Sequence, residues 1–550
     1  MGTSSEIVDT TPAQELLDWV ADGSSRLCRV TGARGSGKSH MLARFLADWG
    51  DGPGTTVHAT VPARGLDVDG TAWELGRQLG YGPQPAHRLL KRVADDPRPL
   101  LLVVPDLHLA RGPETVVGSL LAPLLRLEHV RMAIETADEA LFPGEAKNIG
   151  AKNIDLRCAV FEPPQPQAGF AALLASVPRT ADGRADWVRA PRQVCEQILD
   201  QAPDHDAVQE LLSEPGFLLH GSAAAISASL TDPDSPAPPS LRAVWPLAAP
   251  QLSAREHGAA QRAAFLHTAA LTRDADLATA LRPLAMEYPL PTVWARSDLP
   301  VTALAALADG TVAAAAPPGT PHVLDPATGR STGTLPAPRT ARPSHMAADR
   351  LLLDDRGTLL PATPDAPVAA EIAAYHGQAA LGPRPVLPTA LGSDPRATTA
   401  VIGDTQGTVH VWPLTTFRSL PRAMRLHEAP VSAATCLRLV EDDIDLVFSA
   451  ATDGTVRLWA VGSDPMPGPI EQRPALVTAL AAAGTPAGPV LATAWDDAQL
   501  HLTHVSSGRT RALPLLQQAD ALALTPDGLL TVGGADITYA LRLPPEGLWS

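Results

Sequence analysis

A glycine-rich turn near the start of the chain constrains the fold more than any other feature. Residues 32–39 read Gly-Ala-Arg-Gly-Ser-Gly-Lys-Ser and match the pattern GxxxxGK[ST] at every fixed position. The preceding residues 26–30 are typical of a short strand, and residues 38–49 carry apolar side chains at helical spacing. A strand, a glycine-rich turn and a helix in this order are the context that a phosphate-binding loop requires.

Each residue type in this turn has a physical task. The glycines Gly32, Gly35 and Gly37 permit positive φ and leave room for backbone N–H groups to point at a phosphate. We expect Lys38 to reach the β and γ phosphates and the Ser39 hydroxyl to ligate Mg²⁺, in the positive field of the helix N-terminus. The predicted nucleotide contacts are Gly32, Ala33, Arg34, Gly35, Ser36, Gly37, Lys38, Ser39 and His40.

The first third of the chain alternates strand-like and helix-like segments. Expected strands are residues 26–30, 55–61, 100–106, 130–135 and 154–156, with helices at 12–20, 38–49 and 73–79. The run at 100–104 is apolar without alternation, which suits a parallel strand covered on both faces. We predict an α/β domain over residues 1–163 with a doubly wound parallel sheet, in which ligands bind at the carboxyl ends of the strands.

Asp106 ends the apolar strand on the edge where the glycine-rich turn is expected. We interpret Asp106 as an acid that holds Mg²⁺ through water, and as the first candidate for a catalytic acid. Proteins that hydrolyse ATP at a phosphate-binding loop usually carry two consecutive acidic residues at the end of this strand, one for the metal and one to orient the attacking water. This chain has Pro105 before Asp106, so binding of ATP or ADP with Mg²⁺ is better supported than hydrolysis.

Four further side chains are weaker candidates for this site. Glu135, at the end of the next expected strand, and His108 are placed to orient a water molecule. Arg64 and Arg131 are candidates for contacting the γ-phosphate. Each of the four also fits a structural role at the solvent surface, and the sequence leaves the two interpretations open.

The pattern changes to helical segments without strands over residues 164–290. Expected helices are residues 190–201, 206–212, 254–272 and 274–286. A proline-rich and polar stretch at residues 231–240 cannot continue a helix and predicts an exposed loop. This loop is either a hinge beside the nucleotide site or a simple connection between two helical parts.

The remaining residues 291–550 contain a repeat. Similar strand-like segments begin near residues 301, 344, 389, 431, 477 and 521, so successive starts differ by 43, 45, 42, 46 and 44 residues. A period of about 40 to 45 residues is that of a WD40-type propeller blade. In the clearest copies, residues 403–412 and 451–459, a Gln-Gly or Asp-Gly turn joins two strands and a tryptophan follows.

The last copy, from residue 521, has only about three strands before the sequence ends. A propeller hides its open edges, and residues 292–296 are a candidate for the missing strand. This closure predicts six blades, with seven as the alternative if an irregular blade precedes residue 301. We expect the His and Trp side chains of the repeats to pack, because none of them forms a catalytic or metal-binding pattern.

Composition excludes several classes of partner. The formal net charge is −16 and there is no cluster of Lys and Arg, which argues against nucleic acid. The four cysteines have no metal-site spacing or paired framework. The N-terminus lacks a basic and an apolar targeting region, and no stretch reaches about 18 uninterrupted apolar residues, so we expect a cytoplasmic protein that does not insert into membranes.

Taken together, the turn at residues 32–39, Asp106 and repeats such as residues 453–459 make the chain resemble bacterial STAND-class P-loop NTPases with a C-terminal WD40-type β-propeller. The resemblance implies a nucleotide-controlled switch, in which a repeat sensor holds the ATPase closed until a ligand arrives and assembly then activates an effector. Two features differ from the family pattern. Pro105 stands where an acid is usual, and the nucleotide domain begins almost at residue 1, so any effector is expected to act in trans.

The function that we predict is a nucleotide-controlled signalling or scaffold switch. ATP and Mg²⁺ would bind between the α/β core and the helical domain, slow hydrolysis would reset the switch, and the propeller would sense or recruit a protein partner. Assembly as a homo-oligomer is compatible with this pattern. The alternative is an adaptor that keeps ATP or ADP as a structural ligand without hydrolysing it, which Pro105 favours.

Overall fold

The chain divides into two compact units, Met1–Pro238 and Pro239–Ser550. The boundary falls inside the proline-rich stretch at residues 231–240, within the segment that the sequence analysis treats as one helical domain. The computed structural model describes residues 12–23, 25–32, 38, 41–42, 45–46, 57–137, 141, 151–156, 169–254, 257–316, 320–336, 343–363, 366–416, 418–439, 444–545 and 547–549.

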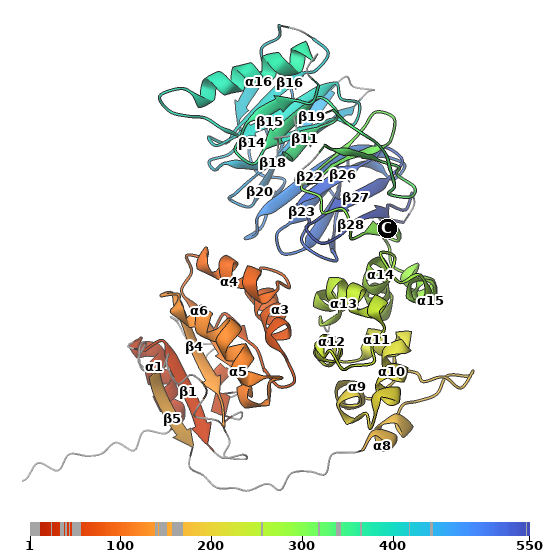
Figure 1. The fold of residues 1–550 in the computed structure, drawn as a ribbon. Helices are drawn as coiled ribbons and strands as arrows, with labels where there is room; N and C mark the ends of the chain where they lie inside the picture. Colours follow the sequence, from red (N-terminus) through yellow and green to blue (C-terminus); the bar gives the residue numbers. More distant parts are fainter. Residues whose placement is uncertain are drawn as a thin grey trace, which may run out of the picture. The chain divides into compact units, whose positions relative to one another are not determined.

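A five-stranded parallel sheet forms the core of the first unit (Figure 1). Its order is β2-β3-β4-β1-β5, and all four pairings are parallel. The strands are β1 (Leu27–Gly32), β2 (Ala59–Thr60), β3 (Leu100–Val104), β4 (Val130–Glu135) and β5 (Ala151–Leu156). The α/β character expected for this part of the chain is therefore confirmed.

Apolar side chains project from both faces of this sheet, which explains why the sequence of β3 does not alternate between apolar and polar residues. Leu100, Leu102 and Val104 join the core on one face, whereas Leu101 and Val103 join the core on the other. The first face is covered by α3 (Val68–Gln78), α4 (Ala86–Ala94), α5 (Pro113–Val116), the π-helical turn η2 (Val117–Leu121) and α6 (Ala122–Arg126). The second face is covered by α1 (Pro12–Asp22) and by residues of the predicted helix 38–49.

Only part of the helix predicted after the glycine-rich turn is described. Lys38, Met41, Leu42, Phe45 and Leu46 are helical. Met41, Leu42 and Phe45 are buried against β1 and β3, as their spacing predicts. The described helical residues that follow β1 in sequence therefore pack on the sheet.

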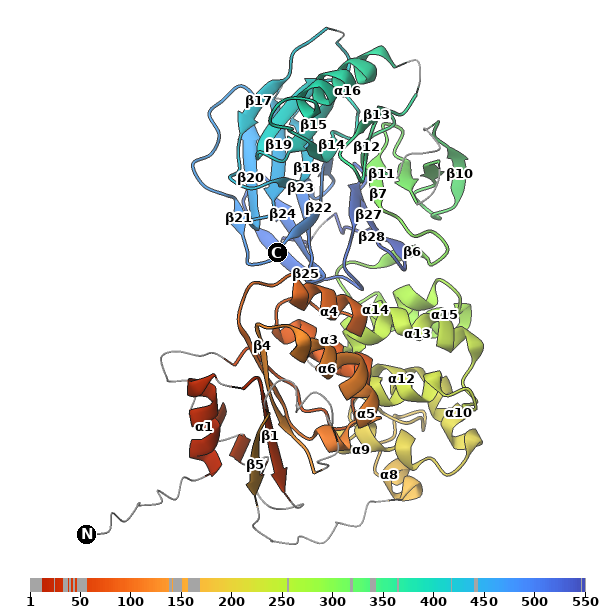
Figure 2. The same cartoon turned by 60° about the vertical axis from the view of Figure 1, so that its left-hand side comes forward.

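The rest of the first unit is helical (Figure 2). Its elements are α8 (Phe170–Ala175), α9 (Arg192–Gln197), the 3₁₀ turn η3 (Leu199–Gln201), α10 (His205–Ser213), α11 (Pro215–His220) and α12 (Ala223–Thr231). The side chains of Asp204 and Ser222 accept hydrogen bonds from Ala207 N and Ala225 N and so cap α10 and α12. The helices expected at 190–201 and 206–212 are present, whereas α11 and α12 were not predicted.

Three helices open the second unit: α13 (Pro239–Leu252), α14 (Ala259–Ala270) and α15 (Ala275–Ala285). They are fastened to the sheets that follow. Gln251 Nε2 donates a hydrogen bond of 2.6 Å to Leu515 O, and the hydroxyls of Thr268 and Thr292 lie 2.6 Å apart. These helices therefore form one compact body with the repeat region.

Residues 292–542 of the second unit form a six-bladed β-propeller (Figures 1 and 2). Its first three blades contain β7 (Ala303–Ala306), β8 (Val312–Ala315), β9 (His322–Leu324) and β10 (Ser331–Thr334); β11 (Pro343–Ala347), β12 (Leu351–Asp354) and β13 (Leu359–Pro361); and β14 (Pro388–Ser393), β15 (Thr399–Asp404), β16 (Thr408–Pro413) and β17 (Arg422–Arg425). The other three contain β18 (Val431–Leu439), β19 (Ile444–Ala451), β20 (Thr455–Ala460) and β21 (Glu471–Gln472); β22 (Val477–Thr485), β23 (Gly488–Trp495), β24 (Gln499–His504) and β25 (Thr510–Pro514); and β26 (Ala521–Leu524), β27 (Leu529–Gly533) and β28 (Thr538–Arg542).

The propeller is closed by a strand from before the first blade, as predicted. β6 (Thr292–Arg296) pairs antiparallel with β28 and completes the sixth sheet. The inner strands contact one another in the order β7, β11, β14, β18, β22 and β26, and β26 contacts β7. The ring therefore closes with six blades, which excludes the seven-bladed alternative.

The second blade has a helix where the other blades have an outer strand. Its three described strands are followed by α16 (Pro367–Ala380), which contacts β13 and lies at the periphery of the propeller in both views (Figures 1 and 2). Ala369, Ile372 and His376 are the buried residues of α16. The repeat pattern did not predict this helix.

The strand pairs are held by the turn and tryptophan residues that identify the repeat. Asp404 Oδ1 accepts hydrogen bonds from Gln406 N at 2.8 Å and Thr408 N at 3.0 Å across the turn. Gly407 has φ of 78°, and an added Cβ would lie 2.1 Å from His427 O, so only glycine fits. Trp412, Trp459 and Trp495 are at most 3% exposed, which confirms the packing role expected for these rings.

Candidate functional site

Sheet register places the ends of β1, β4 and β3 side by side. Val30 lies opposite Glu135, and Val104 lies opposite Ile134. Asp106 therefore extends just past the ends of the strands, near the level of the Thr31–Gly32 end of β1. Since β4 lies between β1 and β3, two strand spacings of about 4.8 Å separate the ends of β1 and β3 by about 10 Å.

The described part of the glycine-rich turn consists of its first residue and its lysine. Gly32 has φ of 144°, which lies in the region that favours glycine. Lys38 is 4% exposed, and its Nζ donates a hydrogen bond of 2.8 Å to Gly32 O. The ammonium group thus lies against the carboxyl end of β1. Ala33, Arg34, Gly35, Ser36, Gly37, Ser39 and His40 lie outside the described residues, so their contacts stay predictions.

Asp106 is held in an unusual backbone conformation. It has φ of 56°, in the left-handed region, and it immediately precedes the 3₁₀ turn η1 (Leu107–Leu109). Aspartate adopts this region more readily than most residues. Arg64 Nε lies 3.2 Å from Asp106 Oδ2, and the exposed fractions of the two side chains are 66% and 18%. The carboxylate at the end of β3 is therefore paired with a cation.

The segments that follow β2 and β3 are joined by backbone hydrogen bonds. Ala63 N donates to Pro105 O and Gly65 N donates to Leu109 O, each at 2.9 Å. These two bonds flank Arg64, so its backbone position is fixed. The two segments form one layer at the carboxyl edge of the sheet.

Arg111 connects this layer to the helical part of the first unit. Its Nε donates to Gly65 O at 3.0 Å, and its Nη2 lies 2.5 and 2.6 Å from the two carboxylate oxygens of Asp200. Asp200 lies in η3, between α9 and α10. Nothing in the sequence signals this pair, because the two residues are 89 positions apart.

Glu135 is the second acid that the sequence places at this edge. It is 2% exposed and ends β4, directly beside Val30 of β1. The next residue continues the pairing, since Thr136 N donates to Val30 O at 3.1 Å. Glu135 therefore lies between the strands that carry Lys38 and Asp106 at their ends, although its role stays a prediction.

The remaining weaker candidates lie in different settings. Arg131 Nη1 and Nη2 donate to Val20 O and Trp19 O at 2.9 and 2.5 Å, and its guanidinium carbon lies 4.5 Å from the Trp19 ring centroid. Arg131 therefore fastens the end of α1 to β4, which is a structural role; a contact of Arg131 with the γ-phosphate stays a prediction. His108 is half-buried in η1, two residues beyond Asp106.

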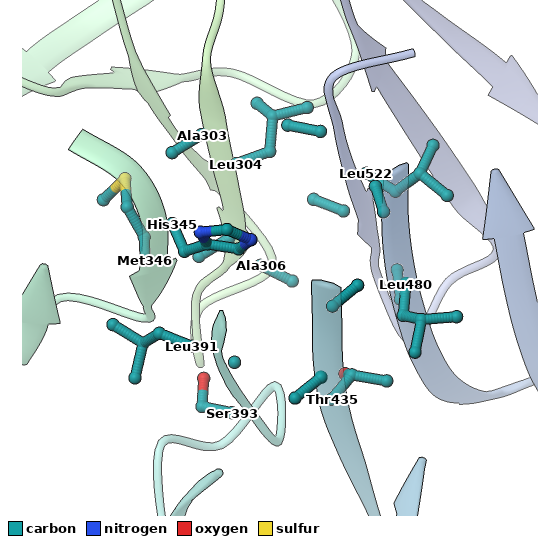
Figure 3. A pocket seen from close by; sticks show the side chains of 18 of the residues that line it. Ala303, Leu304, Ala306, His345, Met346, Leu391, Ser393, Thr435, Leu480 and Leu522 are labelled. Carbon is teal, nitrogen blue, oxygen red and sulfur yellow. The ribbon is translucent and has the colours of Figure 1, made fainter. Parts of the chain in front are cut away.

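The propeller has a central channel, which is lined by the inner strands of all six blades. His345 lies in the middle of this lining (Figure 3). After the β-bulge in the first strand of their blades, Ala390, Ala433 and Ala479 occupy the register position that His345 has in the second blade.

Burial lowers the pKa of His345 to about 4, so the ring is neutral at pH 7. Its Nδ1 lies 3.2 Å from Ser344 Oγ. His345 was not predicted as a functional residue, although an alignment of the bulged strands shows one histidine where the other three strands have alanine. The ring narrows the channel with a polar but uncharged group.

The propeller also contains two clusters of hydrogen-bonded histidine side chains. Trp412 Nε1 donates to His376 Nε2 at 3.2 Å, and His410 Nε2 lies 3.1 Å from Asp404 Oδ2. Burial, and secondarily the neighbouring His410, lowers the pKa of His376 to about 4. This cluster attaches α16 to the third blade.

The second cluster lies inside the fourth blade. His427 Nδ1 lies 3.1 Å from Thr455 Oγ1, and its Nε2 lies 2.8 Å from Ser449 Oγ. Burial lowers the pKa of His427 to about 4. The part of the chain that the structure describes contains no group of three or more His, Cys, Asp or Glu side chains that would hold a metal ion.

The chain is similar to solved structures of β-propellers. No family model and no curated protein matches the chain. Among solved structures, the chain is similar to the β-propeller domain of Cps50 (Swd1) from Myceliophteria thermophila, with 14% identity over 44% of this chain and 83% of that one, at a TM-score of 0.30. It is also similar to the WD40 repeats of RRP9, with 15% identity over 46% of this chain and 98% of that one, at a TM-score of 0.30.

None of the described helices combines the length and apolar character needed to cross a bilayer.

Proposed function

We propose that the first unit binds ATP or ADP with Mg²⁺ at the carboxyl edge of its sheet, and that the chain is a nucleotide-controlled scaffold whose propeller recruits a protein partner. A cytoplasmic location and association into a homo-oligomer belong to the same proposal. The observation that carries it is the position of the glycine-rich turn in the strand order.

The strand order β2-β3-β4-β1-β5 gives the sheet a switch point between β1 and β4. The connection from β1 leads past β4 and β3 to β2, whereas the connection from β4 leads past β1 to β5. Adjacent strands whose connections leave in opposite directions open a crevice at their carboxyl ends, and ligands of open parallel sheets bind there. The turn at residues 32–39 follows β1 directly at this point.

The charged side chains at the edge fit a metal-bound triphosphate. Lys38 is placed at the end of β1, and Asp106 lies about two strand spacings away, near the end of β3. The Asp106 carboxylate already pairs with a cation, the Arg64 guanidinium, so a metal cation could bind the carboxylate in the same place. With nucleotide bound, Ser39 and Asp106 would hold Mg²⁺, which neutralises phosphate charge, and Lys38 would bind the phosphates.

The alternative function, a non-hydrolysing adaptor, is favoured by the residues around Asp106. Pro105 replaces one of the two acids usual in hydrolysing relatives, and Arg64 occupies the remaining carboxylate. A long-lived nucleotide complex without phosphate release would then be the working state. Phosphate release measured on the full chain separates the two functions, since release that Asp106→Asn abolishes supports hydrolysis.

Calorimetric titration of the full chain with ATP and ADP, with and without Mg²⁺, tests nucleotide binding. Lys38→Ala is expected to weaken binding about 100-fold, because it removes a buried cation from the phosphates. Lys91→Ala is the matched control, since Lys91 is an exposed lysine of α4 in the same unit. If the folded chain takes up neither nucleotide, or if both variants bind like the parent chain, the proposal is wrong.

A further inference from the structure

Arg64 occupies a position that the bound metal would need to share. Its guanidinium forms an ion pair with Asp106, at 3.2 Å between Nε and Oδ2. The pair joins the segment after β2 to the residue after β3, which are 42 positions apart in sequence. It therefore exists because β2 and β3 are neighbours in the sheet.

The backbone around Arg64 is fixed, but its side chain is free to move. The neighbouring residues Ala63 and Gly65 both donate hydrogen bonds to the segment that carries Asp106. Gly65 is held a second time, because its carbonyl accepts from Arg111 Nε. The Arg64 side chain is 66% exposed, so a change of rotamer moves the guanidinium without disturbing the layer beneath it.

The ion pair is easily exchanged. A pair with one partner two-thirds exposed contributes little to stability, because water and salt screen it. Mg²⁺ delivered with a triphosphate brings two positive charges and prefers carboxylate and phosphate oxygens as ligands. Once displaced, the guanidinium stays within one side-chain length of Asp106, where it matches a terminal phosphate with paired N–H donors.

We propose that Arg64 is a positioning residue whose guanidinium pairs with the Asp106 carboxylate while no metal is bound. When Mg²⁺ binds with nucleotide, the metal displaces the guanidinium from Asp106, and Arg64 then binds the γ-phosphate. The inference rests on the proposed nucleotide site and adds to it a mechanism for sensing ATP against ADP. An exchange of partners on a fixed backbone converts the arrival of a γ-phosphate into a changed contact between the β2 and β3 segments.

Calorimetric titration of the full chain with ATP and with ADP, across a series of Mg²⁺ concentrations, tests the exchange. In Arg64→Gln, Asp106 no longer has a competing cation, so half-maximal enhancement of ATP affinity is expected at about threefold to tenfold lower Mg²⁺. The preference for ATP over ADP is expected to fall about tenfold, because the γ-phosphate loses a charged donor. Arg64→Lys keeps the charge and is expected to restore most of the ATP preference.

Arg192→Gln is the matched control, because Arg192 forms an exposed ion pair with Glu196 at 2.7 Å in α9. It is expected to leave both the Mg²⁺ dependence and the ATP preference unchanged. If Arg64→Gln behaves like this control while the parent chain binds nucleotide, the exchange is refuted and the nucleotide site stands. If the parent chain binds no nucleotide, both proposals are refuted; unfolding midpoints verify that each variant is folded.

Discussion

The two units use their strands in different ways. The sheet of the first unit is open, and the contacts at its carboxyl edge join residues from distant parts of the sequence, such as Arg64 with Asp106 and Arg111 with Asp200. In the propeller most contacts are local within a blade, and the ring depends on one distant pairing, β6 with β28. We therefore expect single substitutions at the carboxyl edge of the first unit to act mainly on the proposed nucleotide binding, and substitutions in the propeller core to act mainly on stability.

The largest expected effect comes from the propeller core. Trp495 is fully buried, and Trp495→Ala is expected to lower the free energy of unfolding of the second unit by about 3–5 kcal/mol, through lost burial and a cavity. Trp549→Ala, at a half-buried ring near the chain end, is the control and is expected to cost less than half as much. Urea unfolding of the full chain measures both.

The same variant also tests the division of roles between the units. Nucleotide affinity of the first unit is expected to stay unchanged in Trp495→Ala under conditions where the second unit is folded. A loss of affinity equal to that of Lys38→Ala would contradict the comparison, because it would make the propeller core part of the site.

A second effect is a loss of propeller stability in acid. The pKa values of His376 and His427 are about 4, below the value of about 6.5 for an unfolded histidine. The unfolded chain therefore binds protons that the folded unit does not, so stability is present above pH 6.5 and is lost as the pH falls towards 4. The loss approaches about 3 kcal/mol for each ring.

In the first unit, the cluster around Asp96 stays ionised over the same range. Burial alone would raise the pKa of Asp96, but hydrogen bonds from Arg98 and Tyr81 lower it to about 2.

Unfolding midpoints between pH 7 and pH 4 are expected to fall less steeply in His427→Gln than in the parent chain. The exposed His205 provides the control His205→Gln, and equal slopes in all three chains would contradict the assignment.

The smallest of these effects concerns ring closure. Gly329 has φ of 65°, and an added Cβ would lie 2.4 Å from Trp294 in β6, so Gly329→Ala is expected to cost about 2–3 kcal/mol of propeller stability. Gly310→Ala is matched in backbone, with φ of 84° and no atom within 4 Å of the added Cβ, and is expected to cost about 1 kcal/mol. Equal shifts of the unfolding temperature in the two variants would show that β6 does not pack closely against the turn that contains Gly329.

The propeller was predictable from sequence because each blade repeats the same local signal. Asp453 accepts a hydrogen bond from Thr455 N, and Trp459 packs four residues later, so one turn and one ring mark each clear copy. Even the closing strand at residues 292–296 followed from counting strands. The helix α16 was not predicted, because the repeat signal consists of strands and turns, although its buried positions Ala369, Ile372 and His376 follow helical spacing.

The candidate site was predictable in its residue types but not in its pairings. The motif at residues 32–39 and Asp106 at the end of β3 are local patterns. The pairing of Arg64 with Asp106 requires β2 and β3 to be adjacent strands in the sheet, and β2 spans only Ala59–Thr60. A two-residue strand carries too little pattern to fix a strand order, which is why sequence alone did not select Arg64 over Arg131.

The pairing of β6 with β28 also sets an order of events during synthesis. Thr538 Oγ1 donates to Leu299 O across 239 positions, so the circle cannot be completed before the ribosome has made nearly the whole second unit. Until then β6 has no strand to pair with. A polypeptide that lacks β28 would leave β6 without this partner and the ring unclosed.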